Sequence, residues 1–174
     1  MHQCALIFVD ALQAPGAQHL AIAGGQRQRL KPGADRAQRV ELLQPAKIVF
    51  GLKGEFSQVI ETLCKQSAIP GLSGQLRNKT IQHDEERFSY IGDGIAIPHL
   101  RVDNLPAPEL ILGLSREGIT FNNHVIKIVL FLVTPAEQPA QHLQLLQRVC
   151  SLLPAIRNEL LVQRDPARVL KVLA

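Results

Sequence analysis

The nine residues Val125–Val133 constrain the fold of this chain more than any other stretch. They read Val-Ile-Lys-Ile-Val-Leu-Phe-Leu-Val, so every residue except the lysine is apolar. A strand this apolar is usually central in a sheet and covered on both faces. Further predicted strands and helices alternate along the chain around it. This alternation indicates an α/β fold in which helices sandwich a mixed β-sheet.

Hydrophobic periodicity and turn residues place the other elements. In residues 55–68, apolar side chains recur at offsets of three, four, seven and eight, as on one face of a helix. Pro154 should end the helix that begins at Pro139, because an interior proline removes a helical hydrogen bond. The remaining strands are expected at Lys47–Leu52, Ile95–Ile97 and Glu109–Ser115, and the helices at Glu55–Ala68, Ser73–Arg87, Pro139–Leu153, Ala155–Gln163 and Pro166–Leu173.

Two regions differ in composition. Residues 1–43 are rich in Gly, Pro, Gln and Ala and lack a sustained hydrophobic period, which predicts a weakly structured N-terminal extension. Residues 44–174 carry the periodic segments and are expected to form one domain. The extension could also pack on that domain as an added element, or reflect a start assigned too early.

Charge and cysteine content exclude several classes of protein. Residues 46–150 hold ten basic and ten acidic residues, so the net charge of +4 comes from the two ends. A nucleic-acid-binding protein would concentrate basic charge on one face, so no nucleic-acid partner is expected. The three scattered cysteines form neither a disulfide framework nor a metal motif, which fits a reducing cytoplasm. No apolar segment approaches the ~20 residues that span a membrane.

The segment Ile91–His99 carries the first candidate for chemistry. Gly92 and Gly94 permit backbone conformations that side chains forbid, and Pro98 fixes its own φ. A glycine turn, a short apolar strand and a proline should therefore hold His99 on a stiff support at the end of a strand. Neutral imidazole is a good nucleophile near pH 7. The alternative is a strand that happens to end in a histidine.

His142 is the second candidate. Apolar residues follow it at offsets of four, seven, eight and eleven in the helix that begins at Pro139, so the side chain should face the sheet. In the first helical turn it lies near unpaired backbone N–H groups and the positive end of the helix dipole, which favour a bound anion. A core histidine bonded to a backbone carbonyl is the alternative.

These two motifs resemble those of the mannitol, fructose and nitrogen-regulatory IIA domains of the bacterial sugar phosphotransferase system (PTS EIIA type 2). That family has Gly-x-Gly-Ile-Ala-Ile-Pro-His, which residues 92–99 match, and a His-Leu pair about forty residues later, matched by His142-Leu143. The resemblance covers roughly residues 42–174. It is closest to the standalone nitrogen-regulatory branch, since no IIB or membrane IIC part lies within the chain.

The resemblance implies a cytoplasmic phosphohistidine carrier in sugar transport or nitrogen regulation. His99 would accept a phosphoryl group from phospho-HPr, and His142 would support the transfer. The group would pass to a IIB domain, or its presence would signal to a regulatory target protein. No cofactor, metal or membrane insertion is implied.

The sequence departs from the family pattern before the glycine turn. Where the family has Arg-Glu, an ungapped count gives His83-Asp84, and Phe88-Ser89-Tyr90 replaces Ser-Thr-Gly. The phosphate-binding candidates are therefore His83, Arg87 and Arg101. The departures also favour an alternative, a degenerate IIA-like regulatory domain that binds partners without phosphotransfer. A DNA-linked regulator that uses the basic extension is a weaker alternative.

The extension gives a first testable prediction. A chain that starts at Glu41 should melt within a few degrees of the full chain, because residues 1–40 lack the apolar period needed to join a core. Thermal unfolding of both chains, followed by circular dichroism, measures the difference. A large fall in melting temperature would show instead that the extension packs on the domain.

Overall fold

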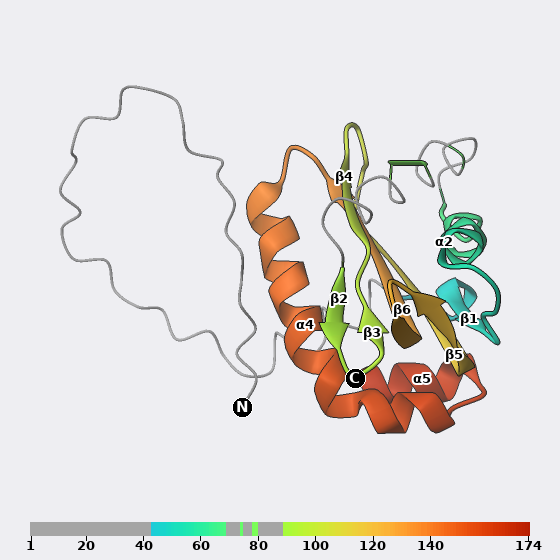
Figure 1. The fold of residues 1–174 in the computed structure, drawn as a ribbon. Helices are drawn as coiled ribbons and strands as arrows, with labels where there is room; N and C mark the ends of the chain where they lie inside the picture. Colours follow the sequence, from blue (N-terminus) through green and yellow to red (C-terminus); the bar gives the residue numbers. More distant parts are fainter. Residues whose placement is uncertain (1–42, 69–73, 75–77, 80–88) are drawn as a thin grey trace, which may run out of the picture.

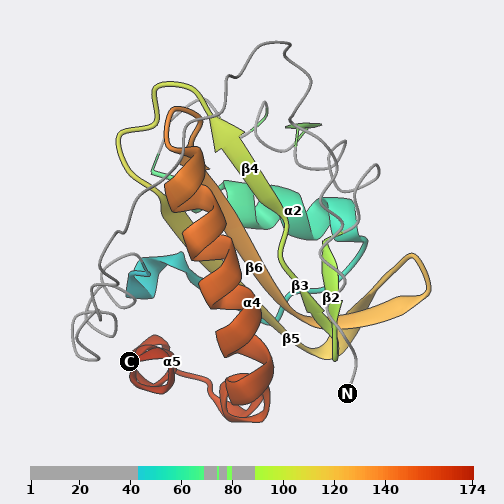
Figure 2. The same cartoon turned by 90° about the vertical axis from the view of Figure 1, so that its left-hand side faces the viewer.

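The domain is a layered α/β sandwich, as the sequence predicted. The computed structural model describes residues 43–68, 74, 78–79 and 89–174. A six-stranded mixed sheet lies between α2 (Phe56–Cys64) on one face and α4 (Pro139–Val162) with α5 (Pro166–Leu173) on the other (Figure 1). Figure 2 shows α4 crossing one face of the sheet, in front of β6.

The sheet is built around its longest pair of strands. β5 and β6 are antiparallel, β1 extends the sheet beside β5, and β3 and β4 both pair in parallel with β6. The order is β1-β5-β6-β3-β2, with β4 also on β6. A short 3-10 helix, Pro45–Lys47, precedes the first strand, and the strands are β1 Ile48–Phe50, β2 Tyr90–Gly92, β3 Ile95–Ala96, β4 His99–Val102, β5 Glu109–Phe121 and β6 His124–Pro135.

β6 has the central position that its composition predicted. Side chains alternate between its two faces, as strand geometry requires. Val129, Phe131 and Val133 join the apolar cluster on the α2 side, whereas Leu130 and Leu132 join the cluster on the α4 side. All five are at least 96% buried. This two-sided burial explains why the strand carries almost no polar side chains.

The hairpin of β5 and β6 is longer than the sequence indicated. β5 was expected to end at Ser115, where polar residues begin, but it continues to Phe121. The ladder shifts register between Leu114 and Ile119, so the polar stretch is an irregularity within the strand. Asn122 and Asn123 then turn the chain with φ of 45° and 64°, which asparagine tolerates better than most residues.

The predicted helix break at Pro154 is wrong. One 24-residue helix, α4, includes Pro154 in its interior. Val149, Leu153 and Leu160 are buried on both sides of the proline, so packing on the sheet compensates for the missing hydrogen bond. Pro154 itself is exposed, and α4 changes direction in its second half (Figure 1). A proline commonly causes such a bend.

The structure confirms two of the other predicted helices. α2 is confirmed but ends at Cys64, before the expected Ala68. α5 is confirmed with its predicted cap, because the Asp165 carboxylate accepts a hydrogen bond from the Ala167 N–H. Most of the helix expected at 73–87 and nearly all of the extension lie outside the described residues.

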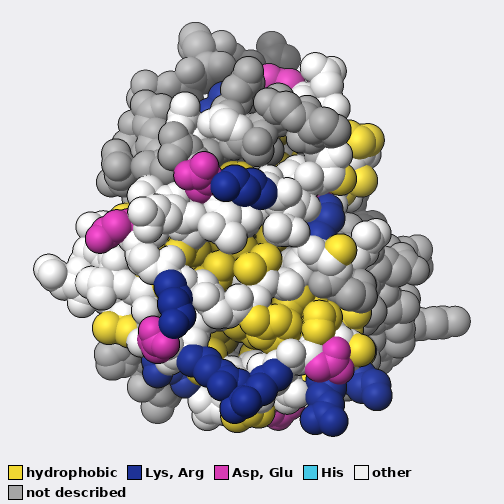
Figure 3. Space-filling model, turned by 90° about the vertical axis from the view of Figure 1, so that its right-hand side faces the viewer, with side chains coloured by type: hydrophobic (Ala, Val, Ile, Leu, Met, Phe, Trp, Pro, Cys, Tyr) yellow, Lys and Arg dark blue, Asp and Glu magenta, His cyan; other side chains and the backbone are white. Residues whose placement is uncertain are grey.

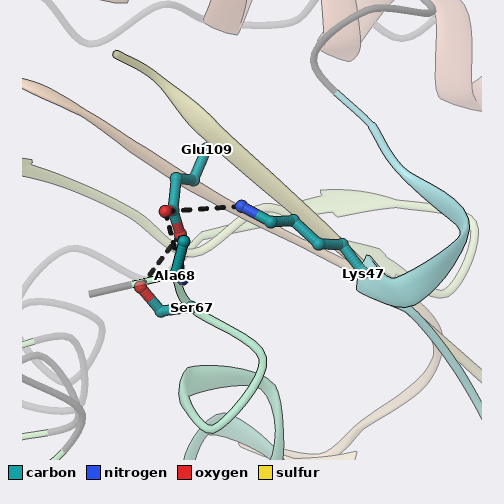
Figure 4. A network of polar contacts seen from close by, with 4 residues as sticks. All are labelled: Lys47, Ser67, Ala68 and Glu109. Atoms are coloured by element: carbon teal, nitrogen blue, oxygen red, sulfur yellow. Dashed lines mark hydrogen bonds and ion pairs between the residues drawn. The ribbon is translucent and has the colours of Figure 1, made fainter. Parts of the chain in front are cut away.

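A buried carboxylate ties α2 to the sheet. Glu109, the first residue of β5, lies 3.3 Å from Lys47 Nζ, and both side chains are at most 14% exposed. Its carboxylate also accepts hydrogen bonds from the Ser67 hydroxyl and the Ala68 N–H (Figure 4). Three segments that are distant in sequence therefore meet at one charge.

This network predicts a strong asymmetry between two glutamates. Glu109→Gln should lower the free energy of unfolding by about 3 kcal/mol, because it leaves the Lys47 ammonium largely buried without its counter-charge. Glu117→Gln is the matched control. Its ion pair with Lys53 is exposed and worth at most about 1 kcal/mol. Urea unfolding of both variants measures the difference, and equal losses would refute this role for Glu109.

Candidate functional site: a pair of histidines at one end of the sheet

The chain that leads to His99 starts from a tight turn that is bonded to β6. Asp93 and Gly94 have φ of 51° and 72° in the turn between β2 and β3. The Gly94 carbonyl accepts hydrogen bonds from the N–H groups of Lys127 and Ile128 at the start of β6. A Cβ at Gly94 would lie 3.0 Å from the Val125 carbonyl oxygen and would require a strained positive φ, so glycine is favoured at this close approach.

From that turn the chain runs along β6 to His99. Ile95 pairs with Ile128, the Leu132 N–H donates to the Pro98 carbonyl, and His99 pairs with Leu132. The sequence placed His99 at the end of a strand. That expectation is wrong, because His99 begins β4 after Pro98 interrupts the edge. Because of this interruption, two short strands, β3 and β4, pair with the same edge of β6.

The ring of His99 has a defined hydrogen bond. Its Nδ1 lies 3.0 Å from the Ile97 carbonyl oxygen, and the residue is half-buried. A carbonyl can only accept, so Nδ1 is the donor in this bond. In the neutral ring the lone pair is then on Nε2. The backbone of the motif thus selects the nitrogen that can act as a nucleophile.

His142 faces the sheet from the first turn of α4, as the sequence predicted. It is 8% exposed. Its Nδ1 lies 2.8 Å from the hydroxyl oxygen of Thr134, near the end of β6. The predicted alternative, a bond to a backbone carbonyl, is not the contact at this nitrogen. Thr134 is fully buried and pairs in register with Arg101 of β4.

The structure brings the two predicted histidines together. Their ring centroids are 5.5 Å apart and the ring planes are tilted by 40°. The pair lies where the start of β4 meets the N-terminal turn of α4. Figure 1 shows β4 and the start of α4 in the upper part of the view. Backbone N–H groups without helical partners gather at such a turn and favour an anion. The pair therefore combines a nucleophilic ring nitrogen, a second imidazole and a helix N-terminus.

The loop that leads into α4 is fixed beside this end of the sheet. The Ala136 N–H donates to the Val102 carbonyl of β4. The Asn104 N–H donates to the Glu137 carboxylate and holds the pKa of this exposed side chain below its ordinary value. These contacts hold the start of α4 against the strand that carries His99.

The cationic candidates are placed only in part. Arg101 lies two residues after His99 on β4, so both side chains project from the same face of the strand. It is exposed, and among the described residues its guanidinium has no ion-pair partner. His83 and Arg87 lie outside the described residues.

Two functional contacts were missed by the sequence reasoning. The Ile97 carbonyl gives no sequence signal of its own, because any residue supplies one. Thr134 gave a signal, since it is the polar residue that ends an apolar buried strand just before Pro135. A hydroxyl at the end of such a strand needs a partner when buried. The partner is the second histidine.

Other parts of the surface carry different chemistry. On the α2 side, hydrophobic side chains form a band, basic side chains gather along the lower edge, and no histidine of the described residues is visible (Figure 3). A cavity of about 320 Å³ lies at the end of the sheet remote from the histidines, lined among others by Phe50, Leu114 and Leu161.

No group of three potential metal ligands occurs in the described parts of the chain. None of the described helices is long and apolar enough to cross a bilayer.

The fold and the site together define an α/β domain with two adjacent histidines, one of which has its Nε2 lone pair available. Residues 41–174 match the family described as phosphoenolpyruvate-dependent sugar phosphotransferase system, EIIA 2. The chain belongs to this family. The family assignment predicted from the two histidine motifs is confirmed.

One curated relative is similar to part of this chain, and solved structures share its fold. A Haloferax volcanii protein named "PTS system fructose-specific EIIA component" is 29% identical over 99 residues, which cover 54% of this chain and 64% of the relative. The nitrogen regulatory protein IIA-Ntr from Neisseria meningitidis has a similar fold, with a TM-score of 0.69 at 17% identity over 78% of this chain and 98% of that chain. The IIA mannitol structure from Escherichia coli gives 0.62 at 18% identity, over 76% and 99%.

Proposed function

We propose that this chain is a phosphoryl-carrier IIA domain that accepts a phosphoryl group on His99 from a phosphohistidine of an HPr-type protein. The observation that carries the proposal is the 3.0 Å contact between Nδ1 of His99 and the Ile97 carbonyl, next to a second histidine. Family membership supports the same chemistry.

In the proposed step the Nε2 lone pair of His99 attacks the phosphorus. A new P–N bond forms as the P–N bond to the donor imidazole breaks, and the donor ring keeps that electron pair. The His99 ring gains positive charge, which its Nδ1–H shares with the Ile97 carbonyl in a strengthened hydrogen bond. The work of the protein is positioning and charge stabilisation, as in other phosphoryl transfers. No metal or cofactor takes part.

The phosphoryl group then has two possible destinations. It passes to a IIB-type domain, or the phosphorylated state itself signals to a regulatory target. A IIB partner is supported by a related fold, because the Escherichia coli enzyme IIAMTL has been solved in complex with phosphorylated enzyme IIBMTL. The regulatory role is supported by the likeness in fold to IIA-Ntr.

A second candidate function is a degenerate partner-binding domain without phosphotransfer. The observation that favours it is the replacement of the family's Arg-Glu by His83-Asp84. A neutral histidine supplies no fixed cation for phosphate oxygens. This candidate predicts partner binding with no gain in mass under the conditions described next.

The decisive variant is His99→Ala. Incubation with enzyme I, HPr and phosphoenolpyruvate should add one phosphoryl group to the native chain, measured by intact mass, and none to His99→Ala. His124→Ala is the matched control. His124 is the first residue of β6 and stacks on Tyr90 of β2, away from the pair. A native chain that gains no mass would favour the degenerate candidate. Undiminished labelling of His99→Ala would contradict the role of His99.

Arg101 is the described cation best placed to act on the phosphoryl group. Arg101→Gln should slow phosphorylation about tenfold, less than the loss of a fully preorganised donor, because solvent screens an exposed charge. Arg116→Gln, an exposed arginine at the far end of the sheet, is the control. Intact-mass measurements on samples quenched at successive times give both phosphorylation rates. An unchanged rate for Arg101→Gln would transfer the role to Arg87 or His83.

A further inference from the structure

We infer that Thr134 sets the tautomer of His142, holding the ring hydrogen on Nε2 so that His142 acts as a hydrogen-bond donor to the phosphoryl group. The inference rests on the proposed function and adds a positioning residue to it. It does not require Thr134 to touch the phosphoryl group.

The Thr134 hydroxyl is buried against one nitrogen of His142. Leu130 and Leu132 of β6 face α4, and Thr134 continues this alternation. The residue is fully buried, and its hydroxyl oxygen lies 2.8 Å from Nδ1 of His142. Among the described residues the hydroxyl has no other hydrogen-bond partner. The threonine is therefore committed to one ring nitrogen.

The burial of Thr134 determines the direction of that hydrogen bond. If Nδ1 carried the hydrogen, the hydroxyl would accept it and its own hydrogen would be buried without an acceptor. An unsatisfied buried donor is unfavourable. If the hydroxyl donates instead, Nδ1 accepts and both groups are satisfied. The neutral ring then carries its hydrogen on Nε2, the nitrogen remote from Thr134.

The two rings of the pair have opposite hydrogen-bond partners at Nδ1. The Ile97 carbonyl is an acceptor and places the hydrogen of His99 on Nδ1, which leaves the lone pair on Nε2. The Thr134 hydroxyl acts as a donor and has the opposite effect on His142. Two chemically equal side chains, 5.5 Å apart, thus become a nucleophile and a donor. The hydrogen-bond partner of each Nδ1, a carbonyl for His99 and a hydroxyl for His142, assigns these roles.

A hydroxyl and a carbonyl have opposite effects at Nδ1. A carbonyl or carboxylate at Nδ1 would favour the opposite neutral tautomer and the imidazolium. With the Thr134 hydroxyl, a hydrogen on Nδ1 of either the neutral or the charged ring would leave the hydroxyl hydrogen buried without an acceptor. Thr134 therefore favours the neutral ring with its hydrogen on Nε2.

The test is the tautomer itself, observed before any phosphoryl transfer. Long-range ¹H–¹⁵N spectra of the full chain with labelled histidine, recorded above pH 8, distinguish protonated from unprotonated ring nitrogens. We expect Nε2–H for His142 and Nδ1–H for His99. Thr134→Val, which keeps the branched shape, should shift His142 to a mixture of tautomers. Thr134→Ser should retain Nε2–H, and the His99 signals should serve as an internal control.

Phosphorylation rates complete the experiment. Thr134→Val should be slower than the native chain in proportion to the fraction of His142 that has lost Nε2–H, about twofold for an equal mixture, and Thr134→Ser should be close to native. Nδ1–H on native His142, or an unchanged tautomer in a folded Thr134→Val protein, would overturn the inference. A chain that is never phosphorylated would refute the proposed function while the tautomer result still stood.

Discussion

The register between β4 and β6 determines the geometry on which the site depends. Because His99 pairs in parallel with Leu132, Arg101 pairs with Thr134, and all four residues belong to the same face of the sheet. α4 lies over that face and brings His142 to Thr134. A shift of one residue would turn His99 to the α2 side, away from its partner. The glycine turn and Pro98 hold the register through backbone hydrogen bonds from β6.

Much of this arrangement could be predicted because it follows from local pattern. The apolar run 125–133 indicated a central strand, and the helical offsets after His142 indicated its inward orientation. Two errors arose where tertiary packing outweighed a local rule. α4 continues through Pro154 because apolar residues on both sides of it are buried, and β5 continues through Arg116–Gly118 because β6 remains beside it. Thr134 and Ile97 were missed because their roles depend on which ring each contacts.

The histidine pair shows how a site can be built from few specialised groups. The described parts of the chain provide no metal cluster at the site, and the basic side chain placed there is exposed. What distinguishes the two imidazoles is the polarity of a single neighbour, a carbonyl for His99 and a hydroxyl for His142. Such second contacts fix tautomer and orientation in many histidine sites. In the proposed transfer, these contacts would give identical side chains different roles.

We propose that the Ile97 carbonyl prepares Nε2 of His99 to carry the phosphoryl group. The most direct measurement is a long-range ¹H–¹⁵N spectrum, with ³¹P detection, of the phosphorylated chain labelled with ¹⁵N in its histidines. We expect a phosphorus coupling to Nε2 of His99 and a hydrogen retained on its Nδ1. A phosphoryl group on Nδ1 of His99, or on any other histidine, would contradict it.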